Sequence, residues 1–412
     1  MLDRFESQIL RACVADLTSR VTPTIQDPGA AATLSMASRL LAHVASRLES
    51  AQLTSPDAEV AALQAEEARE DALLRPDNAA DGITAESLSL YVGKWIEGAE
   101  VSSIEASLGG FSKRTLLLRL SGAPQLDNAL VIRCDEVGGP VESASADELA
   151  ILRLMHRHSV PVAEPLWADP AFPFGGTALS TRRLAGSSAY RATGPAMGPV
   201  GPQAARELAK VLAKVHAVPV AELDLSPELR AARLPEHVKR LVSSFKRQLD
   251  RYREQPSLAL DAAFDYLLTH VPTEAAPPTI VHGDASLRNL MLDGDRVSGL
   301  VDWELWHLGD PNEDLAYCRP EVEQVMAWEE FLAEYQAAGG APWSAEAGAY
   351  YGLFGAVRNA VFGITIIHGF TRSDRPETRY AFAALYLARK LVSDVVRRLK
   401  ELGVATADSH VE

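Results

Sequence analysis

The segment from residue 279 to residue 304 constrains the fold of this chain more than any other. It contains three short apolar runs, and a turn signal, Asp293-Gly294-Asp295, separates the last two; the runs are Thr279–Val281, Leu290–Leu292 and Val297–Val301. β-Branched and apolar runs of this length, bounded by Gly and Asp, are typical of strands joined by tight turns. The pattern predicts a strand, a loop and a hairpin, with the loop ends meeting at one edge of a small sheet.

Three oxygen-bearing side chains lie at the ends of these predicted strands. Asp284 follows the first run within His282-Gly283-Asp284, Asn289 comes five residues later, and Asp302 follows the third run. A carboxylate can accept the proton of a hydroxyl, while an amide oxygen and a second carboxylate can hold Mg²⁺ against the phosphates of ATP. Each residue alone is usually a turn or capping residue, but their order and spacing are typical of phosphoryl transfer. We therefore interpret the chain as a small-molecule kinase.

Composition excludes several other classes. The net charge of −15 argues against a nucleic-acid partner and against adhesion to an anionic membrane. Three distant cysteines suggest neither a disulfide framework nor a zinc site. The first residues lack the pattern of a secretory signal, and the longest apolar stretch, Tyr350–Ile367, contains Arg358 and Asn359 and is interpreted as a buried helix. A cytoplasmic protein is expected.

The chain divides into three predicted parts. Residues 1–95 read as an all-helical N-terminal module, rich in Ala, Glu and Leu. Residues 96–186 read as strands around one helix, and residues 187–405 read mainly as helices that carry the loops of Asp284 and Asp302. The first part contains no recognisable chemistry. It is interpreted as a packing module, a homodimerisation module or a lid over the active site.

A glycine turn and an ion pair are expected to hold the nucleotide. The turn joins two predicted strands and either is a simple hairpin or cradles phosphates with its backbone N–H groups. Its residues are Gly109, Gly110, Phe111 and Ser112. Arg133 stands where a kinase normally has lysine, and Glu148, on the helix predicted over residues 144–156, is its expected partner unless it is only a solvated helix residue. The backbone from Thr181 to Arg183 is placed to meet an adenine edge.

At this point the chain resembles the aminoglycoside and choline kinase type of phosphotransferase. Within that type it is most similar to the kinase-like domain fused to some acyl-CoA dehydrogenases. The resemblance covers roughly residues 100–400. It rests on Leu108–Arg114, Val131–Arg133, Glu148, His282–Asp284 with Asn289, Val301–Glu304, and Gly309–Pro311 with Asp314, Leu315 and Ala316.

The resemblance implies an α+β, bilobal, protein-kinase-like fold, with a small antiparallel sheet in the N-lobe and a mainly helical C-lobe. ATP and Mg²⁺ are expected in the cleft between them. By motif match Asp284 would be the catalytic base, and Asn289 and Asp302 the metal ligands. Asp314 resembles a buried acid that braces the catalytic loop. Two roles stay open: His282 either packs the loop or carries a proton, and Glu304 contacts metal, contacts substrate or caps the backbone.

The acceptor is predicted from charge. The predicted pocket helices offer Arg358, Asn359, His368, Arg372, Arg375 and Arg379, and a helix over residues 234–253 has a basic face that is either solvated or meets an anionic tail. Aminoglycosides are polycations, so complementarity favours a neutral or anionic alcohol, including the hydroxyacyl-CoA that the resemblance suggests. The alternatives are an antibiotic kinase for aminoglycosides or macrolides, a catalytically silent nucleotide-binding module, and a scaffold assembled through the N-terminal helices.

Overall fold

The computed structural model describes most of the chain after residue 81. The described residues are 82–107, 113–135, 145–191, 198–199, 201–253, 256–272, 277–372 and 388–404, with Val14, Leu17, Ile25, Leu34, Ala37, Ser38 and Leu41 as single positions. Nearly all of the predicted N-terminal module lies outside these ranges, as do the homodimer contacts assigned to it. The predicted glycine turn, Gly109 to Ser112, also lies outside the described residues.

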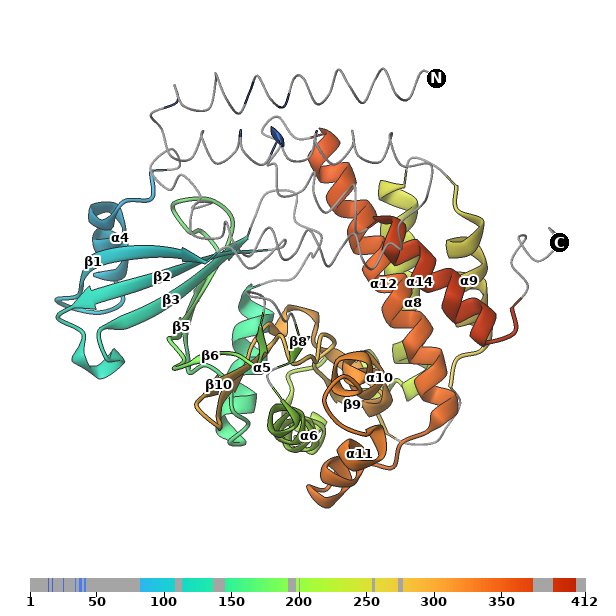
Figure 1. Ribbon diagram of the computed structural model, residues 1–412. Coiled ribbons are helices and arrows are strands. Elements are labelled where there is room, and N and C mark those ends of the chain that lie inside the picture. Colours follow the sequence, from blue (N-terminus) through green and yellow to red (C-terminus); the bar gives the residue numbers. More distant parts are fainter. Residues whose placement is uncertain are drawn as a thin grey trace.

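An antiparallel five-stranded sheet forms the N-lobe (Figure 1). Its strand order is β1-β2-β3-β5-β4. The strands are β1 (Glu100–Ser107), β2 (Lys113–Ser121), β3 (Ala129–Asp135), β4 (Pro165–Asp169) and β5 (Ala178–Arg182). Alternate residues of β2 and β3, such as Leu116 and Ile132, are buried, as expected for strands with one face against a core. The sheet of the expected N-lobe is confirmed, and β4 is a strand that the sequence analysis did not predict.

Two helices accompany this sheet. Helix α4 (Ala85–Val92) begins with a reciprocal capping box between Thr84 and Ser87 and packs its apolar side chains into the same core as β1 and β2. Helix α5 (Ser145–Arg157) has acidic residues in its first turn, where the helix dipole favours them. Its apolar face packs into the C-lobe core, so α5 spans both lobes and brings Glu148 to the cleft. The domain boundary at residue 95 stays a prediction.

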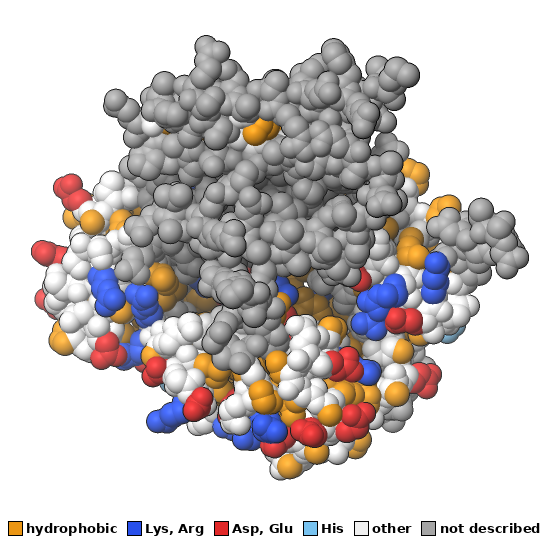
Figure 2. Space-filling view, in the orientation of Figure 1, with side chains coloured by type: hydrophobic (Ala, Val, Ile, Leu, Met, Phe, Trp, Pro, Cys, Tyr) orange, Lys and Arg blue, Asp and Glu red, His pale blue; other side chains and the backbone are white. Residues whose placement is uncertain are grey.

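Helices dominate the C-lobe, as predicted (Figure 1). They are α6 (Pro202–His216), α7 (Pro227–Ala231), α8 (Leu234–Tyr252), α9 (Leu258–Thr269), α10 (Pro311–Val322), α11 (Trp328–Ala337), α12 (Ala345–Arg372) and α14 (Ala388–Glu401). One core contains α6, α10 and α11 together with the apolar face of α5. A second core joins α8, α9, α12 and α14. The basic and acidic side chains of the described surface are interspersed on the face shown in Figure 2.

Short strands and turns carry the loops of the predicted site. They are β6 (Ser187–Ser188), β7 (Tyr190–Arg191), β8 (Gly198–Pro199), β9 (Thr279–Val281), β10 (Leu290–Asp293), β11 (Arg296–Leu300) and β12 (His307–Gly309), with 3-10 turns η3 (Pro124–Leu126), η4 (Val220–Glu222) and η5 (Trp303–Leu305). The predicted β10–β11 hairpin is confirmed, with Asp293 opposite Arg296. The prediction of a single sheet is wrong, because β9 pairs with β12 whereas β10 pairs with β11 and β6.

Two helices differ from the sequence-based expectation. The sequence analysis did not assign α10, which begins at Pro311 with Asp310 as its N-cap; the Asp310 carboxylate accepts the Asn312 N–H at 2.9 Å. Helix α12 is longer than the predicted apolar stretch. Among the described residues it is the one helix long and apolar enough to cross a membrane. However, 67% of its most apolar 18-residue stretch is buried within the protein, as expected of a core helix.

Candidate active site

A cavity of about 440 Å³ lies between the sheet and the C-lobe strands. Its walls are apolar side chains from both lobes, and they include Leu117, Val131, Leu179, Met291 and Leu300. Thr181 and Arg183 line the same cavity at the end of β5, where the sequence analysis placed them. The chain then enters the C-lobe through Gly186, at φ +83°, where an added Cβ would lie 1.8 Å from the carbonyl oxygen of Leu292. Only glycine fits this approach to β10.

Charged side chains fill one end of this cavity. Arg133 Nη1 donates to Glu148 Oε1 at 2.6 Å, so the predicted pair is confirmed. Arg133 Nη2 also donates to Asp302 Oδ1 at 2.5 Å and lies 3.8 Å from Glu304 Oε2. Burial acts to lower the pKa of Arg133, but the charges of Glu148, Asp302 and Glu304 raise it above its ordinary value. This single positive charge therefore lies within 4 Å of three carboxylates.

Lys113 is a site residue that the sequence analysis missed. Its Nζ donates to Glu148 Oε2 at 2.9 Å, and the residue is only 4% exposed. Glu148, 1% exposed, therefore receives one cation on each carboxylate oxygen. The signal available in the sequence was its position directly after the predicted glycine turn. The structure adds that Lys113 pairs with Asp135 at the end of β3.

Asp284 and Asn289 are brought together by the loop between β9 and β10. The amide Nδ2 of Asn289 donates to Asp284 Oδ2 at 2.7 Å and to the Asp284 carbonyl oxygen at 2.9 Å. Burial, and then the charge of Asp302, raise the pKa of Asp284 to about 6. This carboxyl group therefore titrates close to neutral pH, as a general base often does.

Two backbone conformations shape these loops. Gly283 has φ +83°, and a Cβ there would lie 2.3 Å from the carbonyl oxygen of Leu305, so only glycine fits. Asp302 has φ +71° and ψ +58°, a left-handed conformation that costs a non-glycine residue free energy. Such conformations concentrate at functional sites, and here the conformation orients a carboxylate that contacts Arg133.

Asp314 holds the start of the catalytic loop. It is fully buried and accepts the backbone N–H groups of His282 at 2.8 Å and Gly283 at 2.9 Å. His216 Nε2 lies 3.0 Å from the same carboxylate. Burial acts to raise the pKa of Asp314, but the hydrogen bonds from the His216 side chain and from the His282 backbone N–H help to lower it below its ordinary value. This geometry matches the bracing position that the family resemblance implied.

His282 is packed beneath the loop. Its Nδ1 accepts the N–H of Asp284 at 3.2 Å, so its Nε2 donates to the Val301 carbonyl oxygen at 3.0 Å. Burial lowers its pKa, and its ring packs edge-on against Trp303 at 4.6 Å between centroids. A neutral imidazole with both nitrogens engaged ties the Asp284 loop to the Asp302 loop.

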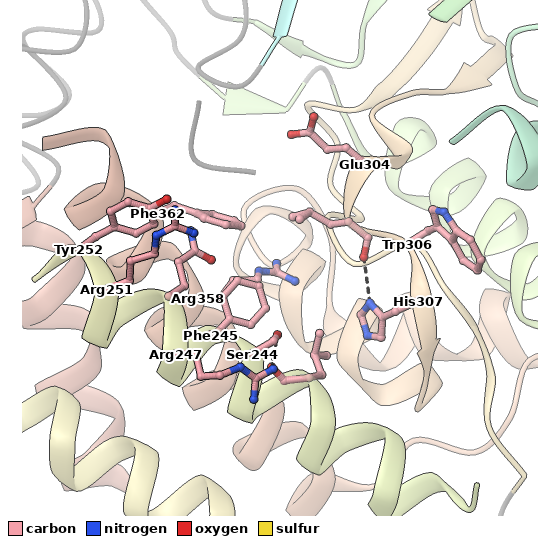
Figure 3. Close-up of a pocket in the computed structure, with 13 residues that line it drawn as sticks. Ser244, Phe245, Arg247, Arg251, Tyr252, Glu304, Trp306, His307, Arg358 and Phe362 are labelled. Carbon is pink, nitrogen blue, oxygen red and sulfur yellow. Dashed lines mark hydrogen bonds between the residues drawn. The ribbon is translucent and has the colours of Figure 1, made fainter. Parts of the chain in front are cut away.

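A second cavity, of about 530 Å³, adjoins this site (Figure 3). Glu304 and Arg358, two of the predicted substrate residues, line it. The third, His368, is not among the lining residues. Its ring centroid lies 5.2 Å from that of Tyr252, and Tyr252 does line the cavity. Arg375 and Arg379 lie outside the described residues.

The bilobal fold and its interlobe cleft are those of a kinase-like phosphotransferase. More specifically, the chain belongs to the phosphotransferase enzyme family, whose model matches residues 103–351. The family resemblance inferred from the motifs is therefore confirmed.

Relatives in sequence carry the names of acyl-CoA dehydrogenases. The chain is 28% identical over 297 residues to the probable acyl-CoA dehydrogenase IBR3 of Arabidopsis thaliana, covering 61% of this chain and 34% of that protein. It is 26% identical over 241 residues to acyl-CoA dehydrogenase family member 11 of Gallus gallus, covering 56% and 30%. The chain thus spans about a third of the length of these relatives.

Solved structures share the fold. A putative aminoglycoside phosphotransferase from Ralstonia eutropha matches with a TM-score of 0.56 at 20% identity, over 77% of this chain and 98% of that one. Spectinomycin phosphotransferase in complex with ADP and spectinomycin matches with a TM-score of 0.52 at 15% identity, over 77% and 98%. These likenesses extend the match in fold to nearly the whole length of both neighbours.

Proposed function

We propose that this protein is an ATP- and Mg²⁺-dependent phosphotransferase that phosphorylates a hydroxyl group of a small molecule. The observation that carries the proposal is the placement of Asp284, hydrogen-bonded to Asn289, next to the charge of Asp302. Lys113 and Arg133 supply two cations at the end of the neighbouring cavity. Positioning and charge neutralisation are what phosphoryl transfer requires of a protein.

In this proposal the nucleotide occupies the 440 Å³ cavity. The apolar walls cover the adenine, and the backbone at Thr181 to Arg183 meets its edge. Its phosphates point toward Lys113 and Arg133, which Glu148 holds in place. A structural neighbour was solved in complex with ADP, which supports nucleotide use in this fold.

Asn289 and Asp302 are the proposed Mg²⁺ ligands. The Asn289 amide nitrogen is turned toward Asp284, so its carbonyl oxygen is the atom left for a cation. No group of three or more His, Cys, Asp or Glu side chains suited to a metal occurs among the described residues. Two hard oxygen ligands fit Mg²⁺, which takes its remaining ligands from phosphates and water. The bound ion would neutralise charge on the transferring phosphoryl group.

Asp284 is the proposed general base. It accepts the proton of the acceptor hydroxyl as that oxygen bonds to the γ-phosphorus, and the bond from the γ-phosphorus to the β,γ-bridging oxygen breaks to release ADP. Asn289 fixes the carboxylate through one of its oxygens. Its pKa of about 6 leaves the group deprotonated at neutral pH, yet more basic than an ordinary carboxylate.

We propose a hydroxyacyl-CoA, or another neutral or anionic alcohol, as the acceptor. The acyl-CoA dehydrogenase names of the sequence relatives support the thioester. The arginines of the 530 Å³ cavity disfavour a polycationic antibiotic, because like charges repel in a partly buried pocket.

MgATP binding and turnover test this function. MgATP at 100 times its dissociation constant should stabilise the protein by about 2.7 kcal/mol. Asp302→Ala should remove the Mg²⁺-dependent part of this stabilisation, whereas Asp284→Ala should keep it and lose turnover of the best acceptor in a screen of hydroxylated metabolites. Wild-type turnover by Asp284→Ala would refute the base assignment, and binding without turnover of any acceptor would favour a silent module.

A further inference from the structure

The 530 Å³ cavity lies between α8, α12 and the segment around η5. Figure 3 shows Glu304 on one side of it, with Arg247, Arg251 and Tyr252 of α8 on the other sides. Glu304 lies 3.8 Å from Arg133 and therefore marks the border with the nucleotide cavity. The cavity thus adjoins the charged end of the nucleotide cavity.

The charged residues that line this cavity are mainly cations. Arg247 and Arg251 are four residues apart on α8 and so project from the same face of the helix. Arg358 comes from α12, and Glu304 is the single carboxylate among the described lining residues. His307 also lines the cavity, and the charge of Glu313 raises its pKa against the effect of burial. Arg358 and His307 both pair with the buried Glu313, whereas Arg247 and Arg251 bring two further positive charges to a described lining with one carboxylate. This excess of positive charge favours an anionic occupant.

Arg358 gives the strongest indication of a ligand. It is 2% exposed, and its Nη1 donates to Glu313 Oε1 at 3.3 Å. Its Nε and Nη2 have no hydrogen-bond acceptor among the described residues. Buried donors of a charged group are costly when unsatisfied, so such donors beside a cavity indicate a missing acceptor. A ligand with anionic oxygens would supply it.

The position of Arg358 connects this subsite to the chemistry. Its guanidinium lies over the ring of Tyr317, 4.5 Å from the ring centroid, and Glu304 of the same cavity lies 3.8 Å from Arg133 of the nucleotide cavity. An anionic group bound here would therefore lie beside the charged end of the nucleotide cavity. An acceptor held by its anionic group can then present a hydroxyl to Asp284.

We propose that this cavity binds the anionic part of the phosphoryl acceptor, which is therefore an alcohol that also carries a carboxylate or phosphate. Arg358 binds the group in the interior of the cavity, and Arg247 and Arg251 bind it from α8. The inference rests on the proposed function, because it places the acceptor beside Asp284. It narrows the acceptor from neutral or anionic alcohols to anionic ones.

Titration with the bare anions tests the subsite. The protein is saturated with MgADP and titrated calorimetrically with inorganic phosphate and with acetate. We expect the double variant Arg247→Gln/Arg251→Gln to lose at least about tenfold in affinity, or about 1.4 kcal/mol, for one of these anions. Arg358→Lys, which keeps the charge but loses the fork of donors, should also weaken it. The matched control is Arg240→Gln, because Arg240 is exposed on α8 outside the cavity lining.

The outcomes separate this inference from the proposed function. Failure of MgADP to bind would count against the kinase proposal. The anion titration is then repeated without nucleotide, and the difference in anion affinity between the double variant and Arg240→Gln still tests whether the subsite exists. Absence of anion binding, or binding equally strong in the double variant and in Arg240→Gln, would overturn the subsite. So would an acceptor screen in which neutral or cationic alcohols are phosphorylated better than their carboxylate- or phosphate-bearing counterparts.

Discussion

Asp284 shows how the surroundings of a single carboxyl group set its chemistry. Burial and the nearby charge of Asp302 both disfavour its ionised form, while Arg358, Tyr317 and Asn289 act in the opposite direction. The balance leaves a pKa of about 6. A carboxylate of ordinary pKa would accept a proton less readily at neutral pH.

This balance predicts the pH dependence of the reaction. Asp284 must lose its proton before it can act as a base, so kcat/KM should rise with pH and reach half of its plateau near pH 6. The measurement is kcat/KM for MgATP between pH 4.5 and 8.5, because this parameter reports the ionisation of the enzyme before Mg²⁺ binds beside Asp302. A profile that stays flat down to pH 4.5 would contradict the base role.

Lys113 and Arg133 both pair with Glu148, the partner that in a kinase usually holds a single lysine near the nucleotide phosphates. Lys113 pairs with Glu148, whereas Arg133 pairs with Glu148, Asp302 and Glu304. We expect Lys113→Met to weaken MgATP binding by at least about tenfold, because a cation is removed near the phosphates. The control is Lys239→Met on the exposed side of α8. Unchanged MgATP affinity in Lys113→Met would show that Lys113 is only structural.

Individual elements were predictable where local signals were complete. Helix α6 begins at Pro202 and ends at His216, and two local signals predict it: a Pro at the start and apolar residues at helical spacing. Helix α10 was missed although Asp310 and Pro311 are typical of a helix start. The pairing of β9 with β12 was not predictable, because His307–Gly309 is too short and polar to read as a strand. The contact of Lys113 with Glu148 joins positions 35 residues apart, and no local pattern indicates it.

The loop after β9 depends on α10 through one side chain. Asp314→Ala would leave two buried N–H groups, of His282 and Gly283, without their acceptor. We expect a loss of about 3–5 kcal/mol in the free energy of unfolding, as for other broken buried charge networks. Urea denaturation measures it, with Glu323→Ala at the exposed end of α10 as the control. Equal stability of Asp314→Ala and Glu323→Ala would contradict the role of Asp314 in bracing the loop.

At the scale of the whole molecule, the ion network joins the lobes. Arg133 belongs to the sheet, Glu148 to α5 and Asp302 to the C-lobe loop. The Arg133 guanidinium therefore links the two lobes through its ion pairs. Because Arg133 Nη2 lies 2.5 Å from Asp302 Oδ1, a Mg²⁺ ion at Asp302 would share this carboxylate with a second cation, and the two positive charges would repel each other.

Free Mg²⁺ should therefore bind weakly. We expect MgATP to raise Tm clearly, whereas Mg²⁺ without nucleotide should leave it almost unchanged at concentrations that saturate MgATP binding. Arg133→Met should make the protein more responsive to free Mg²⁺, because it exposes the Asp302 carboxylate. Thermal melts of both proteins over a Mg²⁺ series measure this, and strong stabilisation of the wild type by free Mg²⁺ would contradict it.

The Arg133 guanidinium thus serves as an internal counter-ion of Asp302 in the resting cleft. Acidic groups that would otherwise repel one another can stay assembled before any substrate arrives. The divalent ion would then arrive already bound to the triphosphate. The rate of the enzyme should therefore depend on the cellular concentration of the Mg²⁺–nucleotide complex and not on that of the free ion.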